Sequence, residues 1–515
     1  MTIRKTFSGR AVGIVTAAAL LLFAVAFRVR TSTSRTSLVH AQSYSCPTYI
    51  MPSSLASTLP TQFVTALGQP AADCMAWQEF ISLNWRADPK HPGLPDPSAT
   101  AATFGTARDV APKVWESYLD SGTIFATAKQ FKALTAEPNV KRLSAISKFA
   151  DGDFGLHSIG QAGNNKWLTS QSGNLTYYEV RVNNDEVAYI ETNTLTTFAG
   201  QAACAAQPGQ NGFGGFNLPS GIGAPTLNNV DYNCAGVAKQ GGYGTNSGAI
   251  EVKAAWTALP ANHSLDYRYK TSIARITDPY GNTSTITVGL VGLHIIHKVP
   301  NAQQFVWATF EQVDNSPDEN NGSYSAPTLP PNPNLIPMPG GTYTYFNLNC
   351  QNDKYYNCVH NQLPGNPCAT PTSSNCDPYS APIQVTRINP VATSENSATG
   401  YAWSLLPPKS VYNYYRLINA MWPNSNSQIP PGARVPLSLG GIQPPGGIAN
   451  TTLETYEQQN GTNCLTCHKG ASIAQASAQT KMLLAGRQHR VVKLDTKPGA
   501  YASDYSFVFA VSTTH

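Results

Sequence analysis

A seven-residue stretch near the end of the 515-residue chain, Asn463-Cys464-Leu465-Thr466-Cys467-His468-Lys469, constrains the fold more than any other feature. Cys-x-x-Cys-His is the attachment signature of a c-type haem. Two thiols three positions apart can form thioether bonds with the vinyl groups on one edge of a porphyrin, and the adjacent histidine can ligate the iron. The motif predicts one covalent haem c on Cys464 and Cys467, with His468 as the axial ligand of the iron.

Two other chemistries use similar cysteine spacing. A structural zinc site needs a second Cys or His pair at comparable spacing, and the chain has no convincing one. A thioredoxin-like Cys-x-x-Cys begins a helix within a βαβ unit, which the residues around Cys464 do not suggest. We therefore favour a haem over zinc or a redox dithiol.

The N-terminal residues have the pattern of an export signal. Arg4, Lys5 and Arg10 precede seventeen uncharged, mostly apolar residues at 11–27. Val39-His40-Ala41 is a candidate cleavage site, so we expect residues 1–41 to be a signal peptide. An uncleaved membrane anchor is the alternative, because seventeen residues is at the short limit for spanning a bilayer. In both cases the bulk of the chain is expected in the periplasm or outside the cell.

The other cysteines agree with an oxidising compartment. Their even number suggests up to four disulfides among Cys46, Cys74, Cys204, Cys234, Cys350, Cys358, Cys368 and Cys376. Cys204 and Cys234 flank a Gly-rich loop and are expected to pair. The four cysteines from Cys350 to Cys376 are expected to pair with one another.

The composition is typical of a loop-rich exported protein that contains β-structure. Charged residues make up 12 %, whereas Gly and Pro number 40 and 38. The net charge of +5 is spread thinly, and no run of Lys and Arg indicates a nucleic-acid partner. No Walker loop or dinucleotide-binding motif is present.

The periodicity of apolar residues predicts a β-rich α+β fold. Helical spacing occurs at 71–85, 114–119, 126–134 and 411–422. Strands are expected at 249–256, 267–276, 283–297 and 305–313, and 175–190 is expected to form a hairpin around Asn183-Asn184-Asp185. This spacing favours an antiparallel, β-sandwich-like body with peripheral helices.

The chain is expected to divide into four parts. After residues 1–41 comes the β-rich body at 42–422, whose N-terminal part is helical, then a Pro/Gly linker at 423–447 and a haem segment at 448–515. About fifty residues would hardly cover a haem on their own. We therefore expect the haem segment to dock on the body.

Six stretches of the chain are FISLNW (80–85), VWE (114–116), GAIEVKAAW (248–256), VGLHIIHK (291–298), WATFEQVDN (307–315) and NTTLETY (450–456). They resemble a family of exported bacterial single-haem c-type cytochromes with a large β-rich body and a C-terminal Cys-x-x-Cys-His motif. The resemblance covers most of the chain from about residue 75 onward. It implies a class and a location but no established reaction.

The residue on the other side of the iron would decide between an electron carrier and a catalyst. Met482 and His489 follow the motif, and Met421 precedes it. His294 and His297 lie on one predicted strand, whose alternation turns them to opposite faces, so only one of them could reach a common metal. We favour Met482, because a haem near the end of a chain most easily recruits a residue of its own tail.

These features predict electron transfer outside the cytoplasm, through one haem c and with a redox partner protein. A haem enzyme with an open iron, acting on peroxide or oxygen, is an alternative because simple electron carriers seldom need so large a body. A surface binding module that carries a haem is another. Beyond the haem motif, no catalytic residue can be assigned.

Overall fold

The computed structural model describes residues 44–62, 68–125, 140–144, 166–206, 218–222, 230–300, 302–336, 342–351, 358–363, 379–423, 442–443, 447–458, 463–468, 471, 473 and 505–510. All of them belong to one compact unit, Tyr44–His515; the other unit, Met1–Ser43, lies outside the described residues. Among the described residues, no helix is long and apolar enough to cross a membrane.

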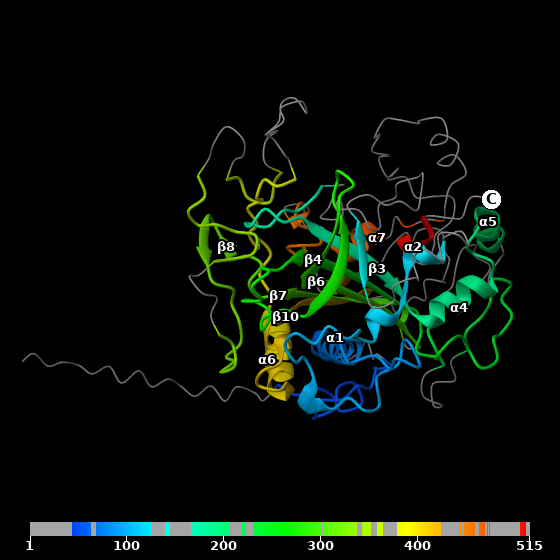
Figure 1. Ribbon diagram of the computed structural model, residues 1–515. Coiled ribbons are helices and arrows are strands. Elements are labelled where there is room, and N and C mark those ends of the chain that lie inside the picture. Colours follow the sequence, from blue (N-terminus) through cyan, green and yellow to red (C-terminus); the bar gives the residue numbers. More distant parts are fainter. Residues whose placement is uncertain are drawn as a thin grey trace, which may run out of the picture. The chain divides into compact units, whose positions relative to one another are not determined.

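The fold is β-rich α+β, as the sequence predicts (Figure 1). Nine strands form one sheet. Its main path follows β1 (Leu119–Asp120), β3 (Thr176–Val182), β4 (Ile250–Ala258), β6 (Thr283–Val299), β7 (Ala302–Gln312), β10 (Tyr415–Pro423) and β11 (Ile442–Gln443). Off this path, β5 (Thr271–Thr277) pairs with β6 and with β2 (Lys141–Ser144). The β2–β5 pair is parallel and the other pairs are antiparallel.

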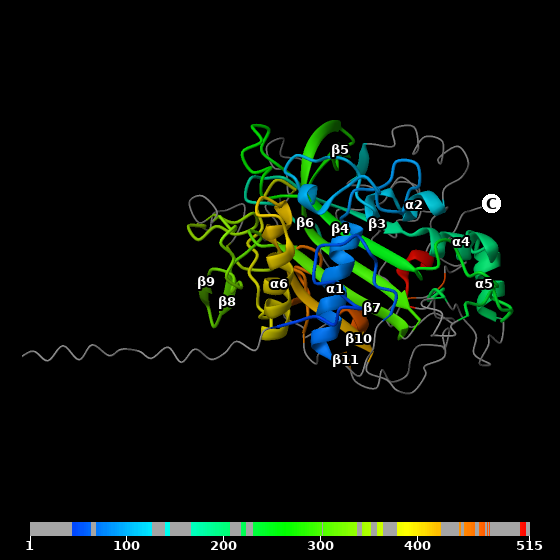
Figure 2. The same cartoon turned by 90° about the horizontal axis from the view of Figure 1, so that it is seen from below.

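Helices cover one face of this sheet. A separate two-stranded sheet is formed by β8 (Asp318–Asn320) and β9 (Ser323–Ser325). Figure 2 shows α1 (Gln69–Leu83) and α6 (Thr393–Leu405) crossing the same face. Alternation along the strands turns residues such as Ala254, Leu293 and Phe310 toward these helices, where they form the main core. Ile296 and Trp307 point to the opposite face and pack with the C-terminal segments. The sheet therefore has one face covered by helices and a second face against which the C-terminal segments pack.

The predicted hairpin at 175–190 is wrong in its second arm. Chain order there is β3, then α4 (Asn184–Thr192). Asn183 Oδ1 accepts from the backbone N–H of Glu186 at 3.2 Å, and Asp185 and Glu186 stand in the first turn. These are the features of a helix N-terminus, because a capping oxygen and early acidic residues satisfy unpaired N–H groups and the helix dipole.

The predicted helix at 411–422 is also wrong, because only Val411–Tyr414 forms a turn of 3-10 helix before β10 begins. A register shift between Leu417 and Asn419 interrupts the alternation of side chains along β10. The apolar residues of this strand therefore do not show the period of two that would predict a strand. The stretch at 114–119 is a short 3-10 turn, Trp115–Ser117, followed by β1. Residues 126–134 lie outside the described residues. The helix at 71–85 and the strands between 249 and 313 are confirmed.

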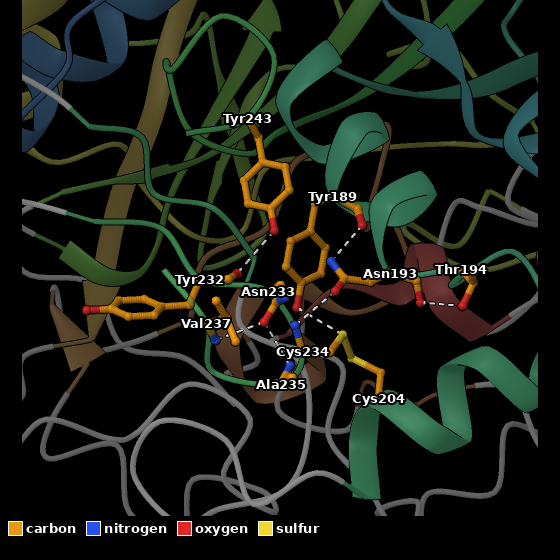
Figure 3. Close-up of a disulfide and its surroundings, with 10 residues drawn as sticks. All are labelled: Tyr189, Asn193, Thr194, Cys204, Tyr232, Asn233, Cys234, Ala235, Val237 and Tyr243. Atoms are coloured by element: carbon orange, nitrogen blue, oxygen red, sulfur yellow. Dashed lines mark hydrogen bonds between the residues drawn. A yellow bond between two sulfur atoms is a disulfide. The ribbon is translucent and has the colours of Figure 1, made fainter. Parts of the chain in front are cut away.

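Three disulfides join cysteines in the described part of the chain: Cys46–Cys74, Cys204–Cys234 and Cys350–Cys358. The expected Cys204–Cys234 pair is confirmed, while Cys368 and Cys376 lie outside the described residues. Figure 3 shows the Cys204–Cys234 bridge below α4, where Asn193 Oδ1 accepts from Cys234 N at 2.9 Å. Disulfides of this kind are compatible with an oxidising, extracytoplasmic location.

Most of the predicted linker at 423–447 lies outside the described residues. Ile442–Gln443 nevertheless forms β11, paired with Pro423 and Trp422 at the end of β10. This part of the stretch is therefore a piece of the sheet and not a free connection.

Candidate functional site

The Cys-x-x-Cys-His motif forms the short helix α7 (Cys464–His468) (Figure 1). Leu465 is fully buried in the cluster on the second face of the sheet, together with Trp307 and Phe509. Cys464 and Cys467 remain thiols, whereas the six other cysteines that the structure describes are all in disulfides. One helical turn thus presents two thiols and an imidazole beside an apolar cluster.

A backbone carbonyl and two aromatic rings hold the imidazole of His468. Its Nδ1 lies 2.7 Å from the carbonyl oxygen of Tyr505. The ring packs edge-on against Trp307 and Phe507, with centroid distances of 6.1 and 4.9 Å. A carbonyl can only accept, so Nδ1 carries the proton and the neutral imidazole keeps a lone pair on Nε2. Burial lowers the pKa of His468 to about 4, so the ring is neutral at neutral pH.

The segment that leads to the motif is bonded to the second face of the sheet. Asn450 Nδ2 donates to Thr309 Oγ1 and to the Phe310 carbonyl, both at 2.9 Å, and its Oδ1 accepts from Thr452 N at 3.0 Å. A methyl group on Gly292 would lie 2.2 Å from Thr452 Oγ1, so only glycine permits this approach. Residues 450–452 therefore attach to the second face of the sheet, and the docking of a haem segment on the body stays a prediction.

A buried ion pair strengthens the same attachment. Glu311 on β7 is paired with Arg387, and its Oε1 accepts from Thr451 N at 2.5 Å. Arg387 also donates to the Ala449 carbonyl at 3.2 Å. Both charged side chains are almost completely buried, at 0 % and 1 % exposed. Glu311 and Arg387 compensate each other's charge, because either residue alone would be an uncompensated buried charge.

A second set of charged or ionisable side chains, Lys253, His294 and Glu454, lies near Cys464. Lys253 on β4 and His294 on β6 are cross-strand neighbours, and His294 Nε2 is 3.3 Å from Glu454 Oε2. Burial raises the pKa of Glu454, but His294 and Lys253 outweigh this effect and hold the pKa below its usual range. Burial, together with the negative charge of Glu454, raises the pKa of the Cys464 thiol. Cys464 therefore lies between an apolar cluster and a set of opposite charges, whereas Cys467 is exposed.

The other predicted iron ligands are distributed over both faces. His297 is fully buried on the α1 face, where its Nδ1 is 2.6 Å from Glu79 Oε1 and its Nε2 is 2.8 Å from the Ser247 carbonyl. Both of its nitrogens are engaged, so the suggestion that His297 ligates the haem iron is wrong. His294 lies on the other face, as strand alternation requires. Met421 is 1 % exposed there, opposite Trp307 in the β7–β10 pairing.

Met482 and His489 lie outside the described residues, so their positions stay predictions. Three residues that shape the site were not predicted from the sequence: Trp307, Glu454 and Tyr505. Trp307 could have been noticed, because its place on the predicted strand at 305–313 is opposite in phase to that of Phe310. Nothing in the sequence signals Tyr505, which enters the site through its carbonyl.

Within the described residues, no three Cys, His, Asp or Glu side chains are grouped to hold a metal ion. Comparison of the chain with protein-family models, curated proteins and solved structures found no match.

Proposed function

We propose that this chain is an extracytoplasmic c-type cytochrome that transfers electrons through a single haem c. Cys464 and Cys467 would hold the haem by thioether bonds, and His468 would ligate its iron. The resemblance to exported single-haem cytochromes and the three disulfides support the class and the location. A redox partner protein in the same compartment would exchange electrons with the haem.

The observation that carries this proposal is the hydrogen bond from His468 Nδ1 to the Tyr505 carbonyl at 2.7 Å. Metal-ligating histidines usually donate their second ring N–H to a carbonyl or carboxylate, which fixes the tautomer and the ring orientation. A histidine that served only as packing would not need a fixed lone pair next to two thiols. Here the bond leaves Nε2 as the atom that can bind iron.

When bound, the haem supplies reversible one-electron chemistry at its iron. The chain's own residues provide its surroundings. Tyr505 orients His468, and Trp307 and Phe507 pack around the imidazole and exclude water from it. Glu454 and Lys253 place opposite charges near the thiols, which limits the net charge that a haem would meet. Burial and local charge are the means by which a protein adjusts the reduction potential of a haem.

The ligand opposite His468 stays open between Met482 and His489, and the third candidate, Met421, lies on the same face of the sheet as the motif. An absorption spectrum of low-spin iron that cyanide and carbon monoxide leave unchanged would support an electron carrier. High-spin iron that binds either molecule would favour the haem-enzyme alternative. Loss of the iron–thioether charge-transfer band in Met482→Ala or in Met421→Leu would identify a methionine ligand.

The test of covalent attachment is a pyridine haemochrome spectrum of the protein, exported in a host that matures c-type cytochromes. We expect the spectrum of a thioether-linked haem in the wild type and its alteration in Cys467→Ala. The matched control is the double substitution Cys350→Ala, Cys358→Ala, which removes a disulfide away from the motif. A wild type without covalent haem, or a Cys467→Ala protein with an unchanged spectrum, would refute the proposal.

A further inference from the structure

Two buried acidic side chains, Asp73 on α1 and Glu395 on α6, lie together where these helices and β10 pack against one another (Figure 2). Burial and then the negative charge of Glu395 raise the pKa of Asp73 well above its usual range, and burial raises the pKa of Glu395. No Lys, Arg or His in the described part of the chain forms an ion pair with either side chain. The described surroundings therefore do not balance the charge of these two acids.

Several other buried carboxylates of this fold have a positively charged partner. They form the pairs Glu116–Lys141, Glu179–Lys141, Glu311–Arg387 and Asp314–Arg268. Some of these carboxylates also have an oxygen without a hydrogen bond, as Glu311 Oε2 has, but there the partner balances the charge. Asp73 and Glu395 differ, because two acids lie beside each other and neither has such a partner.

Hydrogen bonds join the two acids to each other and to β10 in a closed circuit. Ser394 Oγ donates to Asp73 Oδ2 at 2.5 Å, and Asn419 Nδ2 donates to Glu395 Oε1 at 2.7 Å. Gln69 Nε2 donates to Asp73 Oδ1 at 2.7 Å and to the backbone carbonyl of the residue after Asn419 at 2.8 Å. Because Ser394 directly precedes Glu395, the circuit closes, and it holds these side chains in one small region.

Three buried oxygens of this circuit have no hydrogen-bond partner among the described residues: Gln69 Oε1, Glu395 Oε2 and Asn419 Oδ1. Asn419 is 6 % exposed, and its amide is directed at Glu395. Each amide oxygen is two covalent bonds away from a nitrogen that lies 2.7 Å from a carboxylate oxygen, so it is within about 5 Å of that carboxylate oxygen. Two oxygens that bind one Ca²⁺, at about 2.3–2.6 Å each, can also be about 5 Å apart.

A cation satisfies these groups better than protons do. A proton gives a carboxylic acid a single O–H donor, whereas a cation contacts several oxygens and balances both negative charges. We propose that Asp73 and Glu395, with the amide oxygens of Asn419 and Gln69, bind a calcium ion that links α1, α6 and β10. Ca²⁺ accepts irregular sets of oxygen ligands, whereas Mg²⁺ requires a nearly ideal octahedron. The inference does not depend on a haem, so its failure would leave the proposed function unaffected.

The experiment uses the exported full-length protein after treatment with EGTA. Isothermal titration calorimetry with CaCl₂ at neutral pH measures the number of sites and their affinity. We expect one Ca²⁺ per chain, and an affinity at least about tenfold lower in Asp73→Asn and in Glu395→Gln, because ligand charge sets the affinity of calcium sites. The matched control is Glu191→Gln, which removes an exposed carboxylate on α4 and should bind Ca²⁺ as the wild type does.

Thermal unfolding gives a second measurement. Ca²⁺ should raise the unfolding midpoint of the wild type and of Glu191→Gln but not that of Glu395→Gln. A wild type that binds no Ca²⁺, or variants of Asp73 and Glu395 that bind it as tightly as the wild type, would overturn the inference. If neither variant folds, a crystal structure of the wild type grown with CaCl₂ decides. Calcium between Asp73 and Glu395 supports the inference, and its absence from that place overturns it.

Discussion

Replacing Glu116 by Gln should destabilise the protein by an amount that depends on pH. Glu116 is buried at one edge of the core and lies 3.0 Å from both Lys141 and Lys270. Lys141 has a second carboxylate partner, Glu179, at 2.7 Å. Lys270 has no other carboxylate partner in the described part of the chain, and it is 2 % exposed. The substitution therefore leaves the charge of Lys270 uncompensated.

The size of the effect follows from the protonation of Lys270. An uncompensated buried charge costs about 3–5 kcal/mol, but a lysine can avoid this cost by losing its proton. Burial lowers the pKa of Lys270 to about 8 in the wild type, against the attraction of Glu116. At ~1.36 kcal/mol per pH unit, its neutral form lies only about 1.4 kcal/mol above the charged form at pH 7. Deprotonation therefore limits the loss of unfolding free energy that Lys270 causes in the variant to about 1.4 kcal/mol at pH 7.

The sign of the pH dependence is determined by proton binding. In the variant, folded Lys270 has lost its proton even below pH 8, whereas in the unfolded chain the lysine has its ordinary pKa of 10.5 and still binds that proton. The part of the difference between wild type and variant that comes from Lys270 should therefore grow to about 2.7 kcal/mol at pH 6 and vanish by pH 9, in addition to a loss of the Glu116–Lys141 contact that does not change over this range. Urea unfolding of both proteins from pH 6 to pH 9 measures it. In a Lys270→Met background the slope should disappear, and a difference that is constant over this range would refute the reasoning.

Three further substitutions test the fold and the docking of the haem segment. Glu311→Gln leaves Arg387 unpaired and should lower the free energy of unfolding by about 3–5 kcal/mol; a loss below about 1 kcal/mol in urea unfolding would contradict the role of the pair. Gly292→Ala places a methyl group 2.2 Å from Thr452 Oγ1 and should cost about 1–3 kcal/mol. It should also lower the yield of covalent haem, and wild-type yield and stability together would speak against the docking. Asn183→Ala removes the cap of α4 and bonds to the neighbouring strand, so a loss of about 2 kcal/mol is expected, and an unchanged thermal midpoint would contradict it.

The parts of the fold that the sequence predicts correctly are those whose signals are local. The strands β4 to β7 contain runs of β-branched and aromatic residues, and the loop from Cys204 to Cys234 is closed by the expected bridge. The helix α1 is predicted correctly although it is buried on almost every side. The two wrong predictions, a hairpin arm where α4 lies and a helix where β10 lies, both concern stretches whose sequence pattern also fits another structure. Asn183 with Glu186 three positions later is a capping pattern that the β-branched residues on both sides obscured. In β10, an irregularity after Leu417 converts an alternating strand into an approximate helical pattern.

In the candidate site, too, the residues of a local motif could be predicted and those from distant parts of the sequence could not. Cys464, Cys467 and His468 are adjacent in the chain, so their chemistry can be inferred from a short motif. Trp307 and Tyr505 reach His468 from places far away in the sequence, and only the pairing of β7 with its neighbours and the return of the C-terminal segment bring them together. The alternation of β6 does predict that His294 and His297 face opposite ways, but it cannot tell which of them shares a face with the motif.

The most direct test of the account is mass spectrometry of a proteolytic peptide that contains Cys464 and Cys467, taken from the exported protein. The account predicts a peptide heavier by one haem, with both cysteines modified and no thiol left to alkylate. Two alkylatable thiols, or a disulfide between Cys464 and Cys467, in protein from a host that matures other c-type cytochromes would contradict it.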